Sequence, residues 1–349
     1  MSTPKSGAVW SLQQNIELCA LIAAYLAISW TIASVYGIDM QFRLYHRPWW
    51  AANVLVYPPL LVAISLWMLA KARPMRPFRF LVYAYVNEWK LGRRLLLASP
   101  ALLIFPPMFS AFTSIKHSIR SFNSTLIDRE LIDLDYTLHG GHPWELLQPI
   151  LGFPIVTETL DFLYISWFLV IFAVLSWVTF WHDEPELRKQ YLISFALCWI
   201  VLGSFFAVFG ASVGPCYFDI FHPGEPNPFS DLMVYLHSLE NLRATEAQSV
   251  LLRHYADYSP GVGIGISAMP SVHIAIAMLQ TILGWKVGRT AGILATLFLI
   301  AILLGSIHLG WHYAVDGYAS MIAVPFLWVL AGWIVRSTPK SEVALQPAE

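Results

Sequence analysis

"GISAMPSVHIAIAM", residues 265–278, passes from a glycine-containing loop into a run of apolar residues typical of a helix inside a membrane. Pro270 and Ser271 are residue types that begin helices, so we expect His273 in the first helical turn. A histidine is costly at that position in an apolar environment unless it has a partner or a task. The stretch therefore predicts a membrane helix whose first turn is either functional or a serine cap with a histidine at the level of the lipid headgroups.

Apolar runs of this kind recur along the chain and define its fold class. The composition, 57% hydrophobic and 12% charged residues, is not that of a soluble globular domain. A helix needs roughly 20 residues to cross the hydrocarbon core of a bilayer, which is about 30 Å thick. We therefore predict an all-α, polytopic membrane helical bundle of about eight transmembrane helices. They are expected at residues 16–38, 52–70, 95–112, 160–181, 191–212, 269–287, 290–307 and 314–335.

The distribution of Lys and Arg predicts the orientation of the chain. Cytoplasmic segments next to membrane spans carry the excess of these residues. Of the 21 Lys and Arg residues, 14 fall in the segments that would share one side with the N-terminus. Both termini are therefore expected in the cytoplasm, and the two long loops, 113–159 and 213–268, on the extracytoplasmic or lumenal side.

A basic stretch, KARPMRPFR at residues 71–79, separates two leading spans from six later ones. We predict two leading helices with a basic cytoplasmic loop over 1–94, a six-helix core over 95–336 and a cytoplasmic tail over 337–349. The net charge is −1, and the long loops contain more acidic than basic residues. This balance disfavours nucleic acid as a partner and leaves the membrane and its lipids.

Both long loops contain an amphipathic pattern. Apolar residues recur at helical spacing in each of them, at Ile127, Leu131, Leu134 and Leu138, and at Leu232, Tyr235, Leu239 and Leu242. The first pattern predicts a helix on the membrane surface. The second predicts either a helix packed on the mouth of the bundle or a substrate lid.

A second stretch, "GSIHLGWHYAVDGYAS" at residues 305–320, places His308, His312 and Asp316 four residues apart. If this stretch is helical, the three share one face. In the predicted topology it lies on the same side as His273. Two histidines and a carboxylate beside a helix N-terminus, which favours anions, predict phosphoryl transfer. One histidine would attack phosphorus, the carboxylate would orient it, and the other histidine would protonate the leaving oxygen.

A metal site is the main alternative. His308, His312 and Asp316 could present three ligands along one helical face, as in a metal-dependent membrane hydrolase or a metal transporter. Gly310 disfavours a regular helix through the stretch. Chelation separates the two hypotheses, because a phosphohistidine mechanism needs no metal.

The two motifs, Pro270-Ser271-Val272-His273 and His312-Tyr313-Ala314-Val315-Asp316, resemble those of the type 2 phosphatidic acid phosphatase superfamily. The similarity spans roughly residues 95–335. It implies that His312 becomes a phosphohistidine, that Asp316 orients it, that His273 is the general acid and that Ser271 contacts phosphate. It implies neither a metal nor an organic cofactor.

The sequence also departs from that family. Val272 and Ser306 stand where the lipid phosphatases have Gly and Arg, and "GASVGPCYFDIF", residues 210–221, replaces a motif that carries Lys and Arg. These departures resemble the branch of inositol phosphorylceramide synthases, to which Gly214-Pro215-Cys216-Tyr217 is similar. That branch transfers a phospho-headgroup to a lipid alcohol.

The resemblance implies that a lipid phosphate or phospholipid enters from the bilayer, with water or a lipid alcohol as the acceptor. Both acceptors, and the oligomeric state, stay open from the sequence. The expected substrate contacts are Ser271, Val272, Tyr217, Arg253, His254 and His308. Among them, Arg253, His254 and His308 are the candidates to replace the missing cations.

Overall fold

The computed structural model describes residues 7–257, 259 and 261–337, and every regular element within them is a helix. Seven of these helices are long and apolar enough to cross a membrane. They are α2 (Ile16–Tyr36), α3 (His46–Ala72), α5 (Leu91–His117), α9 (Pro154–Phe180), the continuous Pro185–Phe209, α16 (Arg289–His308) and α17 (Ala314–Ser337). The eighth predicted span is α15 (Val272–Val287), which is apolar but has 16 residues. The all-α polytopic bundle is confirmed.

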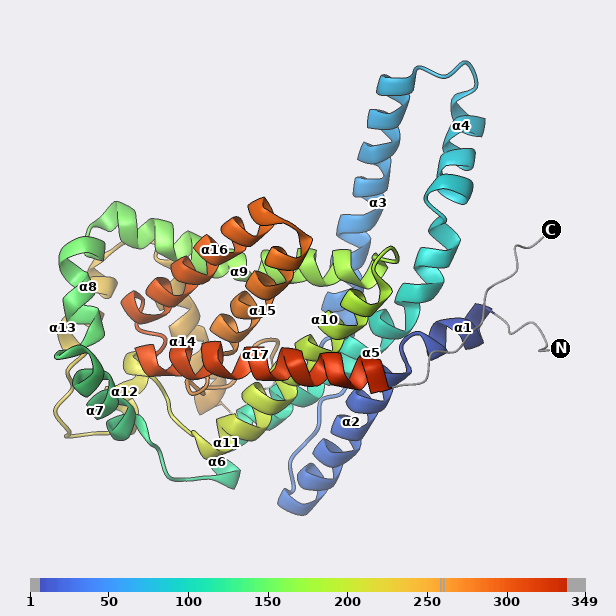
Figure 1. The fold of residues 1–349 in the computed structure, drawn as a ribbon. Coiled ribbons are helices and arrows are strands. Elements are labelled where there is room, and N and C mark those ends of the chain that lie inside the picture. The colour runs from blue at the N-terminus through green and yellow to red at the C-terminus, as the bar shows by residue number, and fades with distance from the viewer. Residues whose placement is uncertain (1–6, 258, 260, 338–349) are drawn as a thin grey trace.

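The span Pro185–Phe209 consists of α10 (Pro185–Leu197), the π-helical segment η2 (Cys198–Phe206) and α11 (Ala207–Phe209). Shorter helices connect the spans: α1 (Gly7–Gln13), α4 (Pro77–Tyr83), η1 (Ala84–Glu88), α6 (Ile119–Phe122), α7 (Asp128–His139), α8 (Pro143–Leu151), η3 (Pro215–Tyr217), α12 (Phe218–Phe221), α13 (Ser230–Ser238) and α14 (Arg243–Ala256). The helices α7, α8, α12 and α13 gather at one end of the bundle (Figure 1). Segments from both long loops therefore lie at the same end.

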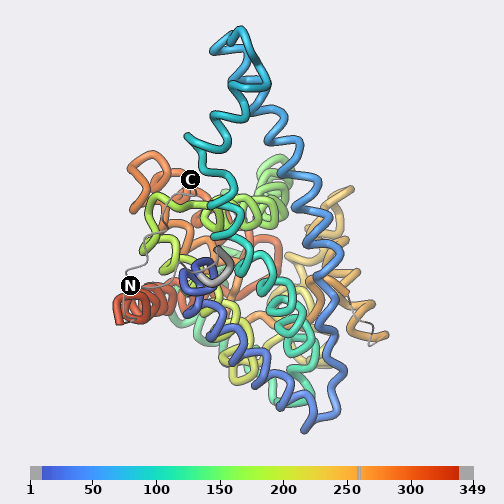
Figure 2. The backbone as a smooth tube through the Cα atoms, turned by 90° about the vertical axis from the view of Figure 1, so that its right-hand side faces the viewer, coloured from blue at the N-terminus to red at the C-terminus, as the bar shows by residue number. Residues whose placement is uncertain are grey.

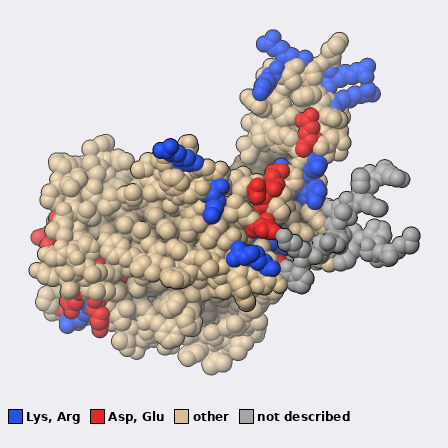
Figure 3. Space-filling view, viewed as in Figure 1, with Lys and Arg blue, Asp and Glu red and all other residues tan. Residues whose placement is uncertain are grey.

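Helices α3 and α4 project from the bundle as a hairpin (Figures 1 and 2). Basic side chains gather at the tip of this hairpin, while the bundle face turned to the viewer is largely uncharged (Figure 3). The basic tip corresponds to the stretch at residues 71–79, as expected for a loop outside the hydrocarbon layer. The predicted tail, 337–349, lies outside the described residues apart from Ser337.

A buried arginine joins the leading helices to the rest of the bundle. The Arg188 guanidinium donates from Nη2 to Asn15 Oδ1 at 2.9 Å and to the Leu97 carbonyl at 3.1 Å. Its Nε donates to the Thr179 carbonyl at 3.1 Å. A buried cation is costly unless its donors are satisfied, so these bonds fix α10 against α5, α9 and the start of α2.

The helices that carry the sequence motifs pack closely. A Cβ added at Gly317 would lie 2.6 Å from Ile274 Cδ1 and 2.7 Å from Leu303 Cδ1. A larger residue would have to displace the ends of the Ile274 and Leu303 side chains, so the glycine lets α17 pack closely against α15 and α16 at this level. The close approach brings the first turns of α15 and α17 together.

The helix predicted in the first long loop is present as α7, but its buried face differs from the predicted apolar face. Asp128, Leu131, Ile132 and Asp135 are buried, whereas Leu134 and Leu138 are 47% and 59% exposed.

The single helix predicted from Leu232 to Leu242 in the second loop is wrong. Helix α13 ends at Ser238, and Asn241 has a left-handed φ of 61°, which starts a new direction before α14.

Candidate active site

Both sequence motifs lie where a helix begins. Ser271 is the N-cap of α15, and His273 is the second residue of that helix. On the other side, α16 ends at His308, and Gly310 turns the chain with a φ of +72°. The N–H groups of Trp311 and His312 both donate to the Ser306 carbonyl, at 2.9 and 3.1 Å. This turn presents His312 immediately before α17.

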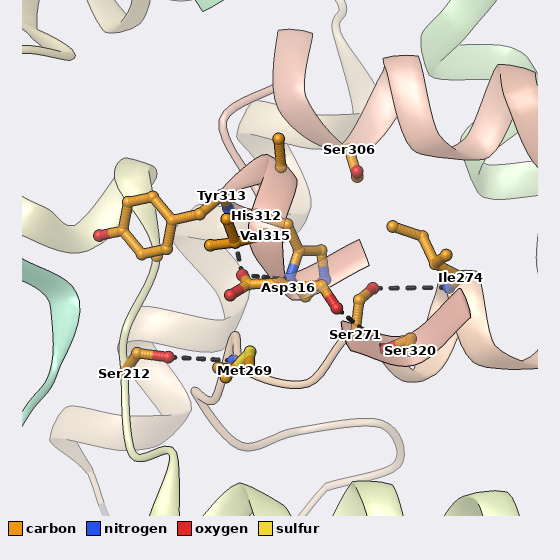
Figure 4. Close-up of polar contacts among 12 residues, drawn as sticks. Ser212, Met269, Ser271, Ile274, Ser306, His312, Tyr313, Val315, Asp316 and Ser320 are labelled. Carbon is orange, nitrogen blue, oxygen red and sulfur yellow. Dashed lines mark hydrogen bonds and ion pairs between the residues drawn. The ribbon is translucent and has the colours of Figure 1, made fainter. Parts of the chain in front are cut away.

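His312 and Asp316 form a directly bonded pair. His312 Nδ1 lies 3.2 Å from Asp316 Oδ2, and the Tyr313 N–H donates to the same oxygen at 3.1 Å (Figure 4). The Ser271 N–H donates to the Asp316 carbonyl at 3.3 Å, which ties the first motif to the second. Since Nδ1 is held by a buried carboxylate, Nε2 is the ring nitrogen left for a substrate.

His273 is held between aromatic rings beside this pair. Its ring stacks on Tyr164 at a centroid distance of 4.9 Å and lies 4.3 Å from the ring of Trp167. The Trp167 indole N–H donates to the His273 carbonyl at 3.0 Å. The imidazoles of His273 and His312 have centroids 6.2 Å apart. The two histidines thus face each other with their orientations fixed.

A cavity of about 170 Å³ opens onto both histidines. Its walls are mainly aromatic and aliphatic, as in most small-molecule sites. Its charged lining residues other than the histidines are Lys116, Asp161 and Arg243. The aromatic lining residues are Tyr45, Phe112, Tyr164, Trp167, Phe168, Trp199, Tyr217 and Trp311.

A buried aspartate of α7 holds the loops around this cavity. Asp128 accepts from the N–H groups of Val213 and Gly214, both at 3.0 Å, and from the Tyr313 hydroxyl at 2.8 Å. Gly214 has a φ of +84°, and a Cβ there would lie 2.6 Å from the Trp311 carbonyl oxygen. The Gly214-Pro215 turn therefore rests directly on the segment that carries His312.

A second aspartate of α7 caps the helix that carries Asp316. Asp135 accepts from the N–H groups of Ala314 and Val315, at 2.8 and 3.0 Å, which satisfies free donors at the start of α17. Burial raises the pKa of Asp135, and these two bonds oppose that rise. The seven-residue spacing of Asp128 and Asp135 was the available signal, because it places both on one helical face.

The expected substrate contacts separate into two groups. Val272 and Tyr217 line the cavity, and the Tyr217 hydroxyl donates to the Gln248 carbonyl at 2.9 Å. Ser271 is buried beside the cavity as the helix cap, and its Oγ is 3.5 Å from the Ile274 N.

The three residues proposed as replacement cations lie elsewhere. Arg253 is exposed on α14, His254 Nδ1 bonds Ser259 Oγ at 2.7 Å, and buried His308 bonds Thr157 Oγ1 at 2.8 Å. The sequence did not single out Lys116 or Arg243, the cations that line the cavity.

The hypothesis of one helical face through His308, His312 and Asp316 is wrong, because the helix stops at His308 and restarts at Ala314. Within the described residues, no three His, Cys, Asp or Glu side chains are grouped to hold a metal ion. The metal hypothesis therefore loses the ligand set on which it was based.

A family model described as the PAP2 superfamily matches residues 129–330. The chain belongs to the PAP2 superfamily. This confirms the resemblance at the level of the superfamily and identifies a membrane enzyme of the phosphatase type. No curated protein and no solved structure matches the chain. The match covers α15, α16 and most of α7 and α17, and it leaves out α1 to α6.

Proposed function

We propose that this membrane enzyme acts on lipid phosphates or phospholipid headgroups through a phosphohistidine at His312. The observation that carries the proposal is the bonded pair of His312 and Asp316, which faces His273 across one cavity. A nucleophile, its orienting carboxylate and an acid are the groups that a two-step transfer requires.

In the first step, His312 Nε2 attacks phosphorus, and the P–N bond forms as the bond to the leaving oxygen breaks. His273 donates a proton to that oxygen, and Asp316 stabilises the positive charge that develops on the His312 ring. In the second step, an acceptor hydroxyl attacks phosphorus, His273 takes its proton, and the P–N bond breaks. His273 thereby returns to its starting state.

The surroundings favour an anionic, amphiphilic substrate. The first turn of α15 leaves backbone N–H groups that favour the equatorial oxygens of a phosphoryl group. The aromatic walls fit the apolar part of a lipid. Entry from the bilayer, on the extracytoplasmic or lumenal side, agrees with the predicted topology.

The acceptor is water or a lipid alcohol. The turn at Gly214-Pro215 replaces the cationic motif of the lipid phosphatases, and it lies against the catalytic segment. This substitution favours the headgroup transfer of the inositol phosphorylceramide synthase-like branch, with a lipid alcohol as acceptor.

The test is lipid mass spectrometry of the purified enzyme with phosphatidic acid, phosphatidylinositol, polyprenyl diphosphate and candidate alcohols. Wild type is expected to form one product, whose mass identifies the acceptor, and His312→Ala none. His237→Ala serves as the control, because His237 is exposed on α13. Undiminished product from His312→Ala would overturn the mechanism.

A further inference from the structure

The phosphate site of this enzyme needs a cation that the family motifs do not supply. Ser306 occupies the place of one family cation, and its side chain donates to the Leu303 carbonyl. Residues 210–221 contain neither Lys nor Arg. The positive charge must therefore come from another part of the chain.

Lys116 stands in the last turn of α5 and lines the same cavity as His273 and His312. It precedes the family-matched region, which begins at residue 129. Lys116 belongs to none of the sequence motifs, and it reaches the site because the fold places the end of α5 there.

A glycine-containing loop covers the stem of this lysine. A Cβ added at Gly265 would lie 3.0 Å from Lys116 Cγ, so the loop rests directly on the side chain. The Gly263 N–H donates to the Tyr45 hydroxyl at 2.8 Å, and Thr113 Oγ1 donates to the same hydroxyl at 3.2 Å. These bonds hold the loop over the end of α5 and confine the lysine to the cavity wall.

The charges around the cavity leave Lys116 uncompensated. Asp161 accepts from the backbone N–H groups of Arg243 and Ala244, at 3.1 and 2.8 Å, and lies 4.0 Å from Arg243 Nη1. Asp161 therefore offsets the charge of Arg243. Across the described part of the chain, the Lys116 ammonium takes part in no hydrogen bond or ion pair. A cation in an apolar wall is costly until an anion arrives.

We propose that Lys116 binds the phosphate of the substrate in place of the family's motif cations. This assignment rests on the proposed function, in which His312 attacks that same phosphate. Lys116 neutralises the phosphate oxygens while His273 faces the leaving group. The segment before the family-matched region thus completes the anion site.

The test measures binding of orthovanadate, a phosphate analogue, by the intrinsic fluorescence of the purified full chain. Trp167, Trp199 and Trp311 line the cavity and report occupancy without turnover. Lys116→Met is expected to raise the Kd about 10- to 100-fold, the effect of losing a charge-assisted bond. Lys116→Arg is expected to stay within a few-fold of wild type. Lys286→Met, at an exposed lysine in the last turn of α15, is the matched control.

Unchanged vanadate binding by Lys116→Met, equal losses in the Met and Arg variants, or no saturable binding by wild type would each overturn the assignment. Lys116→Gln replaces the Met variant if that protein does not fold.

The two proposals fail separately. Lys116-dependent vanadate binding without any lipid turnover would refute the proposed function alone. Turnover that depends on His312 but has an unchanged KM in Lys116→Met would refute the role of Lys116 alone.

Discussion

Replacing Tyr313 by Phe removes one hydroxyl that supports the segment carrying His312. That hydroxyl donates to Asp128 at 2.8 Å, and both side chains are buried. Tyr313 directly precedes the helix that carries Asp316 and follows His312. The variant keeps the ring and so isolates the contribution of a single hydrogen bond.

The expected loss of free energy depends on the hydrogen bonds that Asp128 retains in the variant. A hydrogen bond to a charged group contributes about 1.5–3 kcal/mol. Asp128 retains its bonds from the Val213 and Gly214 N–H groups, so the carboxylate is not left unpaired. We therefore expect the lower end, about 1.5–2 kcal/mol, or roughly a 10- to 30-fold loss of kcat/KM if the whole loss falls on the transition state.

The assay is kcat/KM for the lipid product of wild type, together with the melting temperature. Tyr318→Phe is the matched control, because Tyr318 lies in the nearby helix α17 but its hydroxyl bonds His139 Nε2 at 2.9 Å and not Asp128. A loss in Tyr313→Phe below twofold, or an equal loss in both variants, would refute the claim that Asp128 positions His312 through Tyr313.

Three further predictions test packing, docking and chemistry. Gly317→Val is expected to lower the melting temperature and abolish activity, since the valine side chain would meet Ile274 and Leu303. Gly92→Ala is the control and is expected to be neutral, because the space around Gly92 is open. Arg188→Met is expected to lower stability but leave the KM of the remaining folded enzyme unchanged, because its partners lie at the start of α2, in α5 and in α9 and not at the cavity; a changed KM would contradict this. Turnover is expected to persist in a chelator, and a loss that zinc or magnesium restores would return the weight to a metal mechanism.

The spans were predictable from the sequence because each is a long apolar run, a local property. The predicted run 290–307 and the observed Arg289–His308 differ by one residue at each end. His273, His312 and Asp316 were also within reach, because each belongs to a short motif beside a helix start. The structure brings the three together through Gly317 and the turn at Gly310.

The remaining features depend on contacts between distant parts of the chain. His308 was grouped with His312 on spacing alone, but α16 ends at His308, and the His308 ring bonds Thr157. Lys116 had no motif to mark it, since only the fold brings the end of α5 to the cavity. Asp128 and Asp135 were not singled out, because the apolar pattern around them indicated a helix on the membrane surface, although both aspartates are buried.

The bonds of α7 also determine when this enzyme can become active during its synthesis. Asp128 and Tyr313 are 185 positions apart, and Asp135 and Ala314 are 179 positions apart. Nearly the whole chain must therefore be synthesised before the carboxylates of α7 can accept hydrogen bonds from Tyr313 and from the first residues of α17. Until α17 is inserted, a nascent chain already in the membrane lacks the bonded pair of His312 and Asp316 on which the proposed mechanism depends.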